Sequence, residues 1–422
     1  MRSHPVLRGQ VRAQAAENDP PPGTPHHRPA KKATPHIGMW PSAPDEACRF
    51  IGRKKTTGTN PQLRVRRLLA AASRGEVRYR STVLPRSARD LTVTPEQLIQ
   101  ILATLKIDEH AREAMLAQNV VPIHVSDLDG TLWMEPVADA LVYDRLAASG
   151  ELKPVIRDPL STLMREMGLA PSGLDQSDRG VNRDVLRVKQ AFDRRKGGYG
   201  AEKLAYWSRR IYPLTSWALA GFTADEVRRL TREVIAENGL ENGAFAGAKE
   251  QILALQKAGL DTVLFSASND ILAQEAVDVI FGREPRLEVI GTHVRADAAG
   301  VLTTEVVGGA CFREAKLAKV KGFLRSYVAE KFPDWTARLD LDALRPLLAS
   351  GDSPSKTDEQ MMEDAVIACA VEPATTRDVK SAIRMAKTNG RTFILDYAST
   401  VGGDPADKYR VDRPMGGAVG AL

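Results

Sequence analysis

Two aspartates one residue apart carry the clearest chemistry in this sequence of 422 residues. Asp127 and Asp129 stand in the segment SDLDGTL, directly after the apolar run 120–125. At such a site one carboxylate can attack a phosphorus atom, while the other donates a proton to the leaving oxygen and later accepts one from water. Gly130 allows a tight turn whose amide groups face an anion, and we expect it to bind phosphate together with Thr131. The pattern predicts phosphoryl transfer, with Asp127 as nucleophile and Asp129 as general acid and base.

Two later positions can bind the negative charge of a phosphate group. Ser266 directly follows a predicted strand at 262–265, and we expect it to contact phosphate together with the neighbouring Ala267. The residues that follow open a helix, whose N-terminal amides also favour an anion. Lys316 stands in the first turn of a predicted helix at 314–331, where its ammonium group can balance both the phosphate and the nucleophile. These residues are therefore predicted to bind substrate.

A divalent cation is predicted from a third position. The segment GDS at 351–353 ends another predicted strand, and ligands of an open α/β sheet bind at this end of the strands. An oxygen cage formed by Asp127, the main-chain carbonyl of Asp129 and Asp352 would be hard and anionic. It suits Mg²⁺, which binds one or two carboxylates and keeps several waters. We therefore expect Mg²⁺ as the cofactor.

In their order and topology, these segments resemble the motifs of the haloacid dehalogenase superfamily, in particular its phosphoserine-phosphatase-like branch. The matching segments are DLDGT at 127–131, VLFS at 263–266, CFREAK at 311–316 and GDS at 351–353. The resemblance covers about residues 119–400. It implies a Mg²⁺-dependent phosphomonoester hydrolase that forms an aspartyl-phosphate and acts on a small phosphorylated metabolite, such as a phosphoserine-like or phosphorylcholine-like compound. A phosphotransferase or mutase of the same fold is the alternative.

The fourth motif departs from the family pattern. The family usually places a second aspartate four residues after the first, where this chain has Lys356. Asp358 can take that place only if the loop 354–357 is two residues longer. We therefore treat Asp358 and Ser353 as candidate metal ligands or as residues that support the ligands.

Two further places match the family less closely. Arg313 stands in the third motif where glycine is usual, and Lys319 and Lys321 compete with Lys316 for the role of the motif lysine. We favour Lys316, because it lies nearest the junction between loop and helix. In phosphoserine phosphatases an acidic residue near the start of the inserted cap domain binds the amine of the substrate. Glu135 stands one residue away from the position that this acidic residue usually takes.

The remaining pattern predicts the elements that position these residues. Strands and helices alternate after residue 245, which indicates a parallel sheet covered by helices on both faces. Helical periodicity fills residues 136–245 and interrupts the series directly after its first strand. We therefore expect the α/β class, with a Rossmann-like doubly wound parallel sheet core at 119–135 and 246–400 and an inserted α-helical cap domain at 136–245.

The first 92 residues differ from the rest in composition. Residues 1–92 hold 18 lysines and arginines against 6 aspartates and glutamates, whereas residues 93–422 hold 41 against 47. A basic segment rich in proline buries too little apolar surface to offset its conformational entropy, so we expect a disordered arm. The alternative is an arm that binds nucleic acid or another polyanion. An amphipathic helix at 63–72 is the one element suggested within it.

Order is expected to begin near Val93. Leading helices are predicted in 93–118, the first of them opened by a capping box that starts at Thr94. Residues 401–422 are predicted to form a flexible tail.

Composition also excludes several classes of protein. No stretch approaches 18 uninterrupted apolar residues, and the N-terminus has arginines but no apolar signal segment. Three cysteines are too few for a disulfide scaffold. We therefore expect a cytoplasmic protein without a membrane partner. A polyanion-binding protein with a non-catalytic body is the alternative from another class. The presence of Asp127, Asp129, Lys316 and Asp352 together favours the enzyme.

Overall fold

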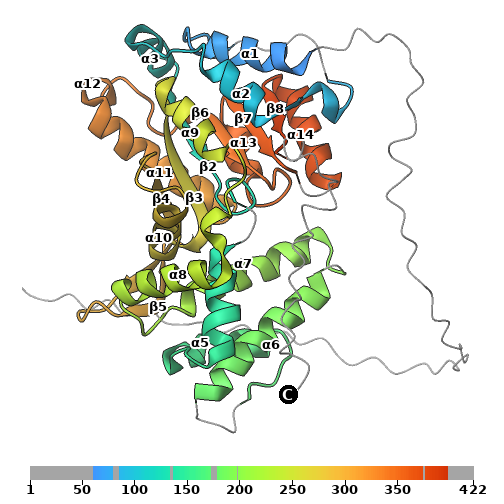
Figure 1. Ribbon diagram of the computed structural model, residues 1–422, viewed down its shortest axis with the longest axis vertical. Coiled ribbons are helices and arrows are strands. Elements are labelled where there is room, and N and C mark those ends of the chain that lie inside the picture. Colours follow the sequence, from blue (N-terminus) through green and yellow to red (C-terminus); the bar gives the residue numbers. More distant parts are fainter. Residues whose placement is uncertain are drawn as a thin grey trace, which may run out of the picture. The chain divides into compact units, whose positions relative to one another are not determined.

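One sheet organises the chain in the computed structural model, which describes residues 60–78, 85–133, 136–172, 178–196, 198–373 and 376–397 (Figure 1). Within these residues eight strands pair in the order β1-β8-β7-β6-β2-β3-β4-β5, and every pair is parallel except the β4–β5 hairpin. The predicted α/β class with a parallel sheet is confirmed. The strands are β1 Thr92–Val93, β2 Val120–Ser126, β3 Asp261–Asn269, β4 Glu288–Ala296, β5 Leu302–Val307, β6 Arg345–Gly351, β7 Ile367–Val371 and β8 Thr392–Leu395.

Helices cover both faces of the sheet, as strand β7 shows. Ile367, Cys369 and Val371 belong to one buried hydrophobic cluster, while Ala368 and Ala370 belong to a second cluster. Because successive side chains of a strand point to opposite faces, both faces of β7 are buried. The helices between and around the strands are α2 Pro95–Leu102, α3 Glu109–Leu116, α9 Ala248–Lys257, α10 Asp270–Ile280, α11 Glu314–Lys331, α12 Pro333–Thr336, α13 Glu359–Asp364 and α14 Thr376–Asn389.

Between β2 and β3 the described residues form helices. Thr223 caps α8 with a reciprocal bond to Glu226, and Gly239 ends the helix in the left-handed conformation at φ 62°. In Figure 1 helices α5, α6 and α7 gather together, away from strands β6, β7 and β8. These helices are α4 Val137–Asp139 with its π-helical continuation η2 Ala140–Ala147, α5 Arg157–Glu166, α6 Asp178–Lys196, α7 Ala201–Trp217 and α8 Ala224–Asn238. Short 3₁₀ turns occur at η1 Ala88–Asp90, η3 Pro154–Ile156 and η4 Leu240–Asn242.

The prediction that residues before Val93 lie outside the folded unit is wrong for those that the structure describes. Helix α1 (Pro61–Ala72) buries Val65, Leu68 and Leu69, each at most 3% exposed, in the larger hydrophobic cluster. The helix predicted within the arm therefore exists, and its apolar stripe packs on the core. Charge composition misled here, because it averages over exposed and buried faces of the same helix.

Buried arginines and a strand pair attach this segment further. Arg64 donates from Nη2 to the carbonyl of Gly390 at 3.0 Å, and Arg391 donates from Nη1 to the carbonyl of Val77 at 2.6 Å. Strand β1 pairs with β8 at the edge of the sheet. The predicted tail 401–422 and the arm before residue 60 lie outside the described residues. None of the helices in the described part of the chain combines the length and apolar character needed to cross a membrane.

Candidate active site

The carboxyl ends of three neighbouring strands meet at one place. The order β6-β2-β3 sets the ends of these strands side by side, and the amide of Asp127 donates to the carbonyl of Ser350 at 2.9 Å. Asp127 and Asp129 follow β2, Ser266 lies in the last part of β3, and Asp352 follows β6. The structure thus brings together residues that are up to 225 positions apart.

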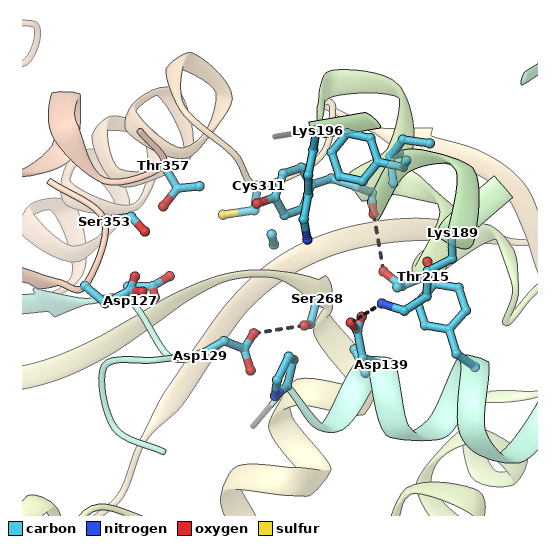
Figure 2. A pocket seen from close by; sticks show the side chains of 18 of the residues that line it. Asp127, Asp129, Asp139, Lys189, Lys196, Thr215, Ser268, Cys311, Ser353 and Thr357 are labelled. Atoms are coloured by element: carbon cyan, nitrogen blue, oxygen red, sulfur yellow. Dashed lines mark hydrogen bonds and ion pairs between the residues drawn. The ribbon is translucent and has the colours of Figure 1, made fainter. Parts of the chain in front are cut away.

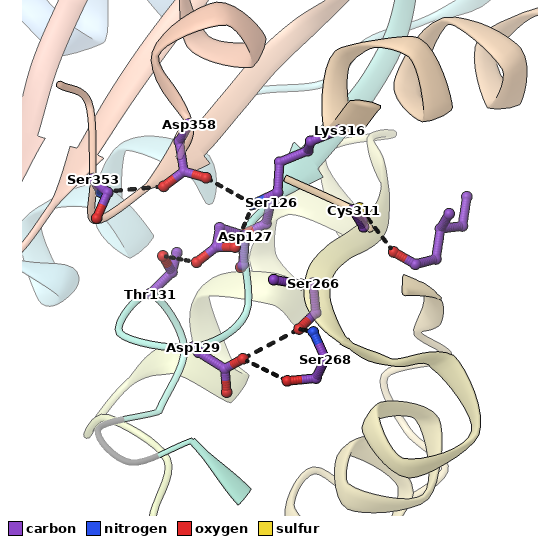
Figure 3. Close-up of polar contacts among 12 residues, drawn as sticks. Ser126, Asp127, Asp129, Thr131, Ser266, Ser268, Cys311, Lys316, Ser353 and Asp358 are labelled. Atoms are coloured by element: carbon purple, nitrogen blue, oxygen red, sulfur yellow. Dashed lines mark hydrogen bonds and ion pairs between the residues drawn. The ribbon is translucent and has the colours of Figure 1, made fainter. Parts of the chain in front are cut away.

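A buried lysine joins the first motif to the fourth. Lys316 is 1% exposed, and its Nζ lies 2.5 Å from Asp127 Oδ1 and 2.7 Å from Asp358 Oδ1 (Figure 3). Burial alone would lower the pKa of this ammonium group, but the charges of Asp127 and Asp358 raise it well above its ordinary value. Nζ of Lys319 instead contacts the carbonyl of Gly291. Among the three lysines of this region, the structure brings Lys316 to the aspartates.

Lys321, the third candidate lysine, points to another part of the core. Its Nζ contacts the carbonyl of Leu344 and the carboxylate of Asp364. Because the three lysines stand at positions 316, 319 and 321 of one helix, the turn of α11 directs them to different neighbours.

The turn before α11 keeps a backbone conformation that suits glycine. Arg313 has φ 50°, in the left-handed region where non-glycine residues are strained. The side chain has its own contact, since Nε donates to the carbonyl of Lys356 at 3.2 Å. Arg313 therefore adopts, in the turn that leads to Lys316, a conformation that glycine adopts without strain.

Three carboxylates form a candidate metal centre. One oxygen of each of Asp127, Asp352 and Asp358 lies within 4.8 Å of the others. Burial, followed by repulsion from Asp358, raises the pKa of Asp127 to about 7 and that of Asp352 to about 8. A divalent cation would relieve this repulsion, and carboxylate oxygens are the ligands that Mg²⁺ prefers. The residues present therefore fit such an ion.

Glycines on both motifs make room for these carboxylates. A Cβ atom on Gly351 would lie 2.6 Å from Asp358 Oδ2, and one on Gly130 would lie 2.7 Å from Asp352 Oδ2. The loop that follows Asp352 returns Asp358 to the site, where Oδ2 accepts from the amide of Ser353 at 3.1 Å. Asp358 thus reaches the cluster despite the two extra residues of its loop.

Asp129 lies apart from the cluster of three carboxylates. Its Oδ1 accepts from Trp133 Nε1 at 2.7 Å, and its Oδ2 accepts from the hydroxyls of Ser266 and Ser268 at 3.1 Å each. Burial raises the pKa of this carboxyl, although the three donors partly oppose the change. The expected metal contact through the main-chain carbonyl of Asp129 stays a prediction.

The other predicted site residues also lie close by. Thr131 donates from Oγ1 to Asp127 Oδ2 at 3.2 Å, and the turn at Gly130 has φ 77°. Ala267 and Ser353 line the same cavity as Asp127 and Asp129. Ser266 donates to Asp129 in the structure, and its predicted role in binding phosphate stays a prediction.

A cavity of about 320 Å³ opens from these residues toward the inserted helices (Figure 2). Two lysines on this side are ion-paired: Lys189 lies 2.8 Å from Asp139, and Lys196 lies 2.7 Å from Asp193. Lys189 also lies 4.3 Å from the centre of the Tyr143 ring. No motif marks this wall in the sequence, because its residues come from separate helices.

Helix α7 touches the third motif directly. The ring of Tyr212 stacks on Phe312 at 4.5 Å, and Arg209 Nη2 lies 3.2 Å from Glu314 Oε1. Tyr212 also lines the cavity. Glu135, considered for the substrate amine, lies outside the described residues.

Comparison with known families identifies this arrangement. A sequence model of haloacid dehalogenase-like hydrolases matches residues 125–363, more than half of the chain. The chain belongs to this family. The match includes all four motifs, from the first pair of aspartates to Asp358, and it agrees with the resemblance drawn from the residues.

Solved structures of related fold are more distant. A protein with unknown function from Bordetella pertussis Tohama I shares 20% identity and a TM-score of 0.41, over 65% of this chain and 98% of the other. A substrate-bound phosphoserine phosphatase shares 15% identity and a TM-score of 0.33, over 67% of this chain and 97% of the other. Cytosolic 5'-nucleotidase IIIB bound to cytidine shares 12% identity and a TM-score of 0.35, over 73% and 87% of the two chains. The search of curated proteins finds no match to this chain.

Proposed function

We propose that this family member is a Mg²⁺-dependent phosphomonoester hydrolase that works through an aspartyl-phosphate on Asp127. The observation that carries the proposal is the contact of Lys316 Nζ with Asp127 and Asp358 at the base of the cavity. A nucleophilic carboxylate beside a dianionic phosphate requires nearby positive charge, and the buried ammonium group supplies part of it. Asp129 lies beside Ser266 and Trp133, away from the lysine, and we assign it the role of general acid and base.

In the first half of the reaction, an oxygen of Asp127 forms a bond to phosphorus as the bond to the leaving oxygen breaks. Asp129 gives its proton to that oxygen, and the alcohol departs. The raised pKa of Asp129 favours the protonated carboxyl that this step needs. Lys316 and Ser266 are expected to contact the phosphate oxygens.

In the second half, water attacks the phosphorus of the aspartyl-phosphate. Asp129, now ionised, takes a proton from the water, and the bond between phosphorus and Asp127 breaks to release inorganic phosphate. The same carboxyl thus acts as acid and then as base, and it returns to its initial protonation state.

Asp127 and Asp352 would hold the Mg²⁺ ion, with Asp358 as the third carboxylate of the cluster. When bound, the ion supplies positive charge that neutralises the phosphate and orients it toward the nucleophile. Because Asp358 Oδ1 contacts Lys316 and Oδ2 contacts the amide of Ser353, Asp358 also helps to place the lysine.

The cavity favours a small organic group on the phosphate. Its volume of about 320 Å³ lies at the low end of ligand pockets, and the inserted helices form one wall of it. That wall carries Tyr143, Phe192 and Tyr212 beside paired lysines and aspartates. Aromatic rings beside paired charges suit a compact polar group, and this supports a small phosphorylated metabolite such as a phosphoserine-like or phosphorylcholine-like compound.

The test is hydrolysis of a panel of small phosphomonoesters by the purified chain with Mg²⁺. We expect phosphate release that stops when a chelator is in excess and returns when Mg²⁺ is added. Asp127→Asn should abolish turnover because an amide does not attack phosphorus. Asp352→Ala should raise the Mg²⁺ concentration needed for half-maximal rate, whereas Asp342→Ala, at an exposed aspartate, should not.

Near wild-type rates for Asp127→Asn, or full activity in excess chelator, would overturn the proposal. Phosphoryl transfer to an added alcohol in place of water would show a phosphotransferase of the same fold.

A further inference from the structure

The carboxylate of Asp129 has three side-chain donors in the structure, and they come from two sides. Ser266 and Ser268, on β3, both donate to Oδ2, as Figure 3 shows. Trp133 donates to Oδ1 from the segment that leads from β2 into the inserted helices. Asp129 is therefore held between the core strand and the entry to the cap.

The three donors differ in whether they allow the oxygen that they contact to carry a proton. An indole N–H only donates, whereas a hydroxyl donates or accepts. Oδ1 must therefore remain an acceptor toward Trp133 whether or not the carboxyl carries a proton. Oδ2 can carry the proton, because either serine can turn its hydroxyl to accept. The contacts thus distinguish the two oxygens and leave Oδ2 as the one that gains and loses a proton.

Trp133 is itself firmly held. The residue is 2% exposed, and its ring lies against Phe281 with centroids 6.3 Å apart. The carbonyl of Trp133 accepts from the amide of Gly130 at 2.9 Å. Trp133 also forms an antiparallel β-bridge with Ala244, on the segment that returns from the inserted helices. A buried indole N–H requires a partner, and the partner it has is the carboxylate of Asp129.

We propose that Trp133 is a positioning residue for proton transfer, which fixes the carboxyl of Asp129 so that Oδ2 faces the reacting phosphate ester. This inference rests on the proposed function. As Asp127 bonds to phosphorus and the bond to the leaving oxygen breaks, the proton on Oδ2 passes to that oxygen. In the second half, water gives its proton to Oδ2 as its oxygen bonds to phosphorus and the bond to Asp127 breaks. Trp133 neither gains nor loses a proton in either step.

The experiment compares two esters that differ in their need for an acid. An alkyl phosphate releases a strongly basic alkoxide and needs the proton, whereas p-nitrophenyl phosphate releases a weakly basic phenolate and needs it little. Trp133→Phe keeps an aromatic ring and removes the N–H. We expect kcat/KM to fall roughly 10- to 100-fold for the alkyl ester and about threefold or less for the aryl ester. We use kcat/KM because it reports the step in which the leaving group departs.

Phe281→Leu is the matched control, since it disturbs the packing of the same indole but keeps the N–H donor. It should leave the ratio of the two kcat/KM values unchanged. Equal losses on both esters for Trp133→Phe would overturn the positioning role while leaving the hydrolase in place. If the unaltered chain hydrolyses neither ester with Mg²⁺, the proposed function fails, and this inference fails with it.

A second measurement needs neither turnover nor the Trp133→Phe variant. The chain has five tryptophans, and their indole N–H groups give separate signals in a ¹H–¹⁵N spectrum. The Trp133 signal is assigned by replacing each of the other four in turn. Asp129→Ala removes the acceptor, so this signal should move further than the other four. An unmoved signal would overturn the contact on which the inference stands.

Discussion

At the scale of single residues, the site brings three carboxyl groups close together. Asp358 lies so close to the main chain of Gly351 that a single added carbon would meet its carboxyl group. Gly351 has no unusual backbone angle to explain its identity, since its φ is not in the left-handed region. The close approach of Asp358 is therefore the physical reason for a glycine here.

We expect Gly351→Ala to displace Asp358 from Lys316 and to lower both activity and stability. The new Cβ would lie 2.6 to 2.7 Å from three atoms of Asp358, and overpacking of this kind typically costs about 1–3 kcal/mol. The measurement is the midpoint of urea unfolding together with turnover.

Gly322→Ala, within helix α11, is the matched control. Apart from its two chain neighbours and the backbone of its own helix, no atom of the described residues lies within 4 Å of its added Cβ. Alanine also favours helix over glycine by up to about 1 kcal/mol. This variant should be as stable as the unaltered chain or more stable. If Gly351→Ala behaved in the same way, the crowding argument would be wrong.

At the scale of elements, strand β2 carries a buried histidine beneath the site. His124 contacts Thr262 Oγ1 through Nδ1 at 3.2 Å and Ser350 Oγ through Nε2 at 2.8 Å. Burial lowers the pKa of His124 to about 3. The unfolded chain binds this proton near pH 6.5, so the unfolded state holds more protons between pH 6.5 and 3. Stability from this residue is therefore retained above pH 6.5 and lost as the pH falls.

We expect His124→Gln to make unfolding less sensitive to acid. Between pH 7 and pH 5 the histidine should remove about 2 kcal/mol from the free energy of unfolding, at roughly 1.4 kcal/mol per pH unit. Glutamine carries a donor and an acceptor but takes up no proton in this range. Urea unfolding at both pH values measures the difference. Parallel losses in the variant and the unaltered chain would contradict the assignment.

The charge composition of the first 92 residues did not indicate that helix α1 packs on the core. The side chain of Asn60 caps the start of this helix, where its Oδ1 accepts from the amide of Gln62 at 2.9 Å. The apolar stripe of the helix lies in the core. A chain that begins at residue 60 keeps this helix, whereas one that begins at residue 93 loses it together with Thr92, one of the two residues of β1.

We expect the chain 93–422 to unfold at a markedly lower temperature than the chain 60–422. Full burial of a valine or leucine contributes about 1.5–3 kcal/mol, and α1 buries Val65, Leu68 and Leu69. Thermal unfolding of both truncated chains measures the difference, and equal midpoints would show that α1 adds little. Leu63→Ala, at an exposed position of the same helix, should change the midpoint little.

At the scale of the whole molecule, the cavity lies between the core and the inserted helices. Tyr212 stacks on Phe312, and Arg209 pairs with Glu314, so α7 meets the core at the segment that leads to Lys316. We therefore expect a small ester to reach Asp127 more easily than a large one.

We expect small phosphate esters to be hydrolysed with a higher kcat/KM than a phosphopeptide that carries the same ester bond. Tyr212→Ala should reduce this preference, because it removes the ring that closes the cavity against Phe312. Tyr206→Ala, at an exposed ring of the same helix, serves as the control. A phosphopeptide hydrolysed as efficiently as the small ester would contradict the assigned role of the cap.

Local pattern determined a large part of this protein. The alternation of strands and helices after residue 245, helix α11 and the capping box at Thr94 are visible in the spacing of residues along the chain, so the sequence predicts them. The short strand β1 was not predicted. The pair Asp127 and Asp129 is equally local, because the two aspartates stand with one residue between them at the end of a predicted strand.

The tertiary structure decided what depends on distant contacts. The turns that lead into the site determine three features. They are the choice of Lys316 as the lysine that contacts Asp127, the left-handed turn at Arg313, and the return of Asp358 to the carboxylate cluster. The hydrogen bond from the Trp133 indole to Asp129 and the wall that the cap contributes to the cavity also depend on contacts that local sequence patterns do not specify. Helix α1 showed an apolar stripe in sequence, but only packing decided that the stripe is buried. A sequence records which groups are present, whereas burial and pairing depend on which segments the sheet order brings together.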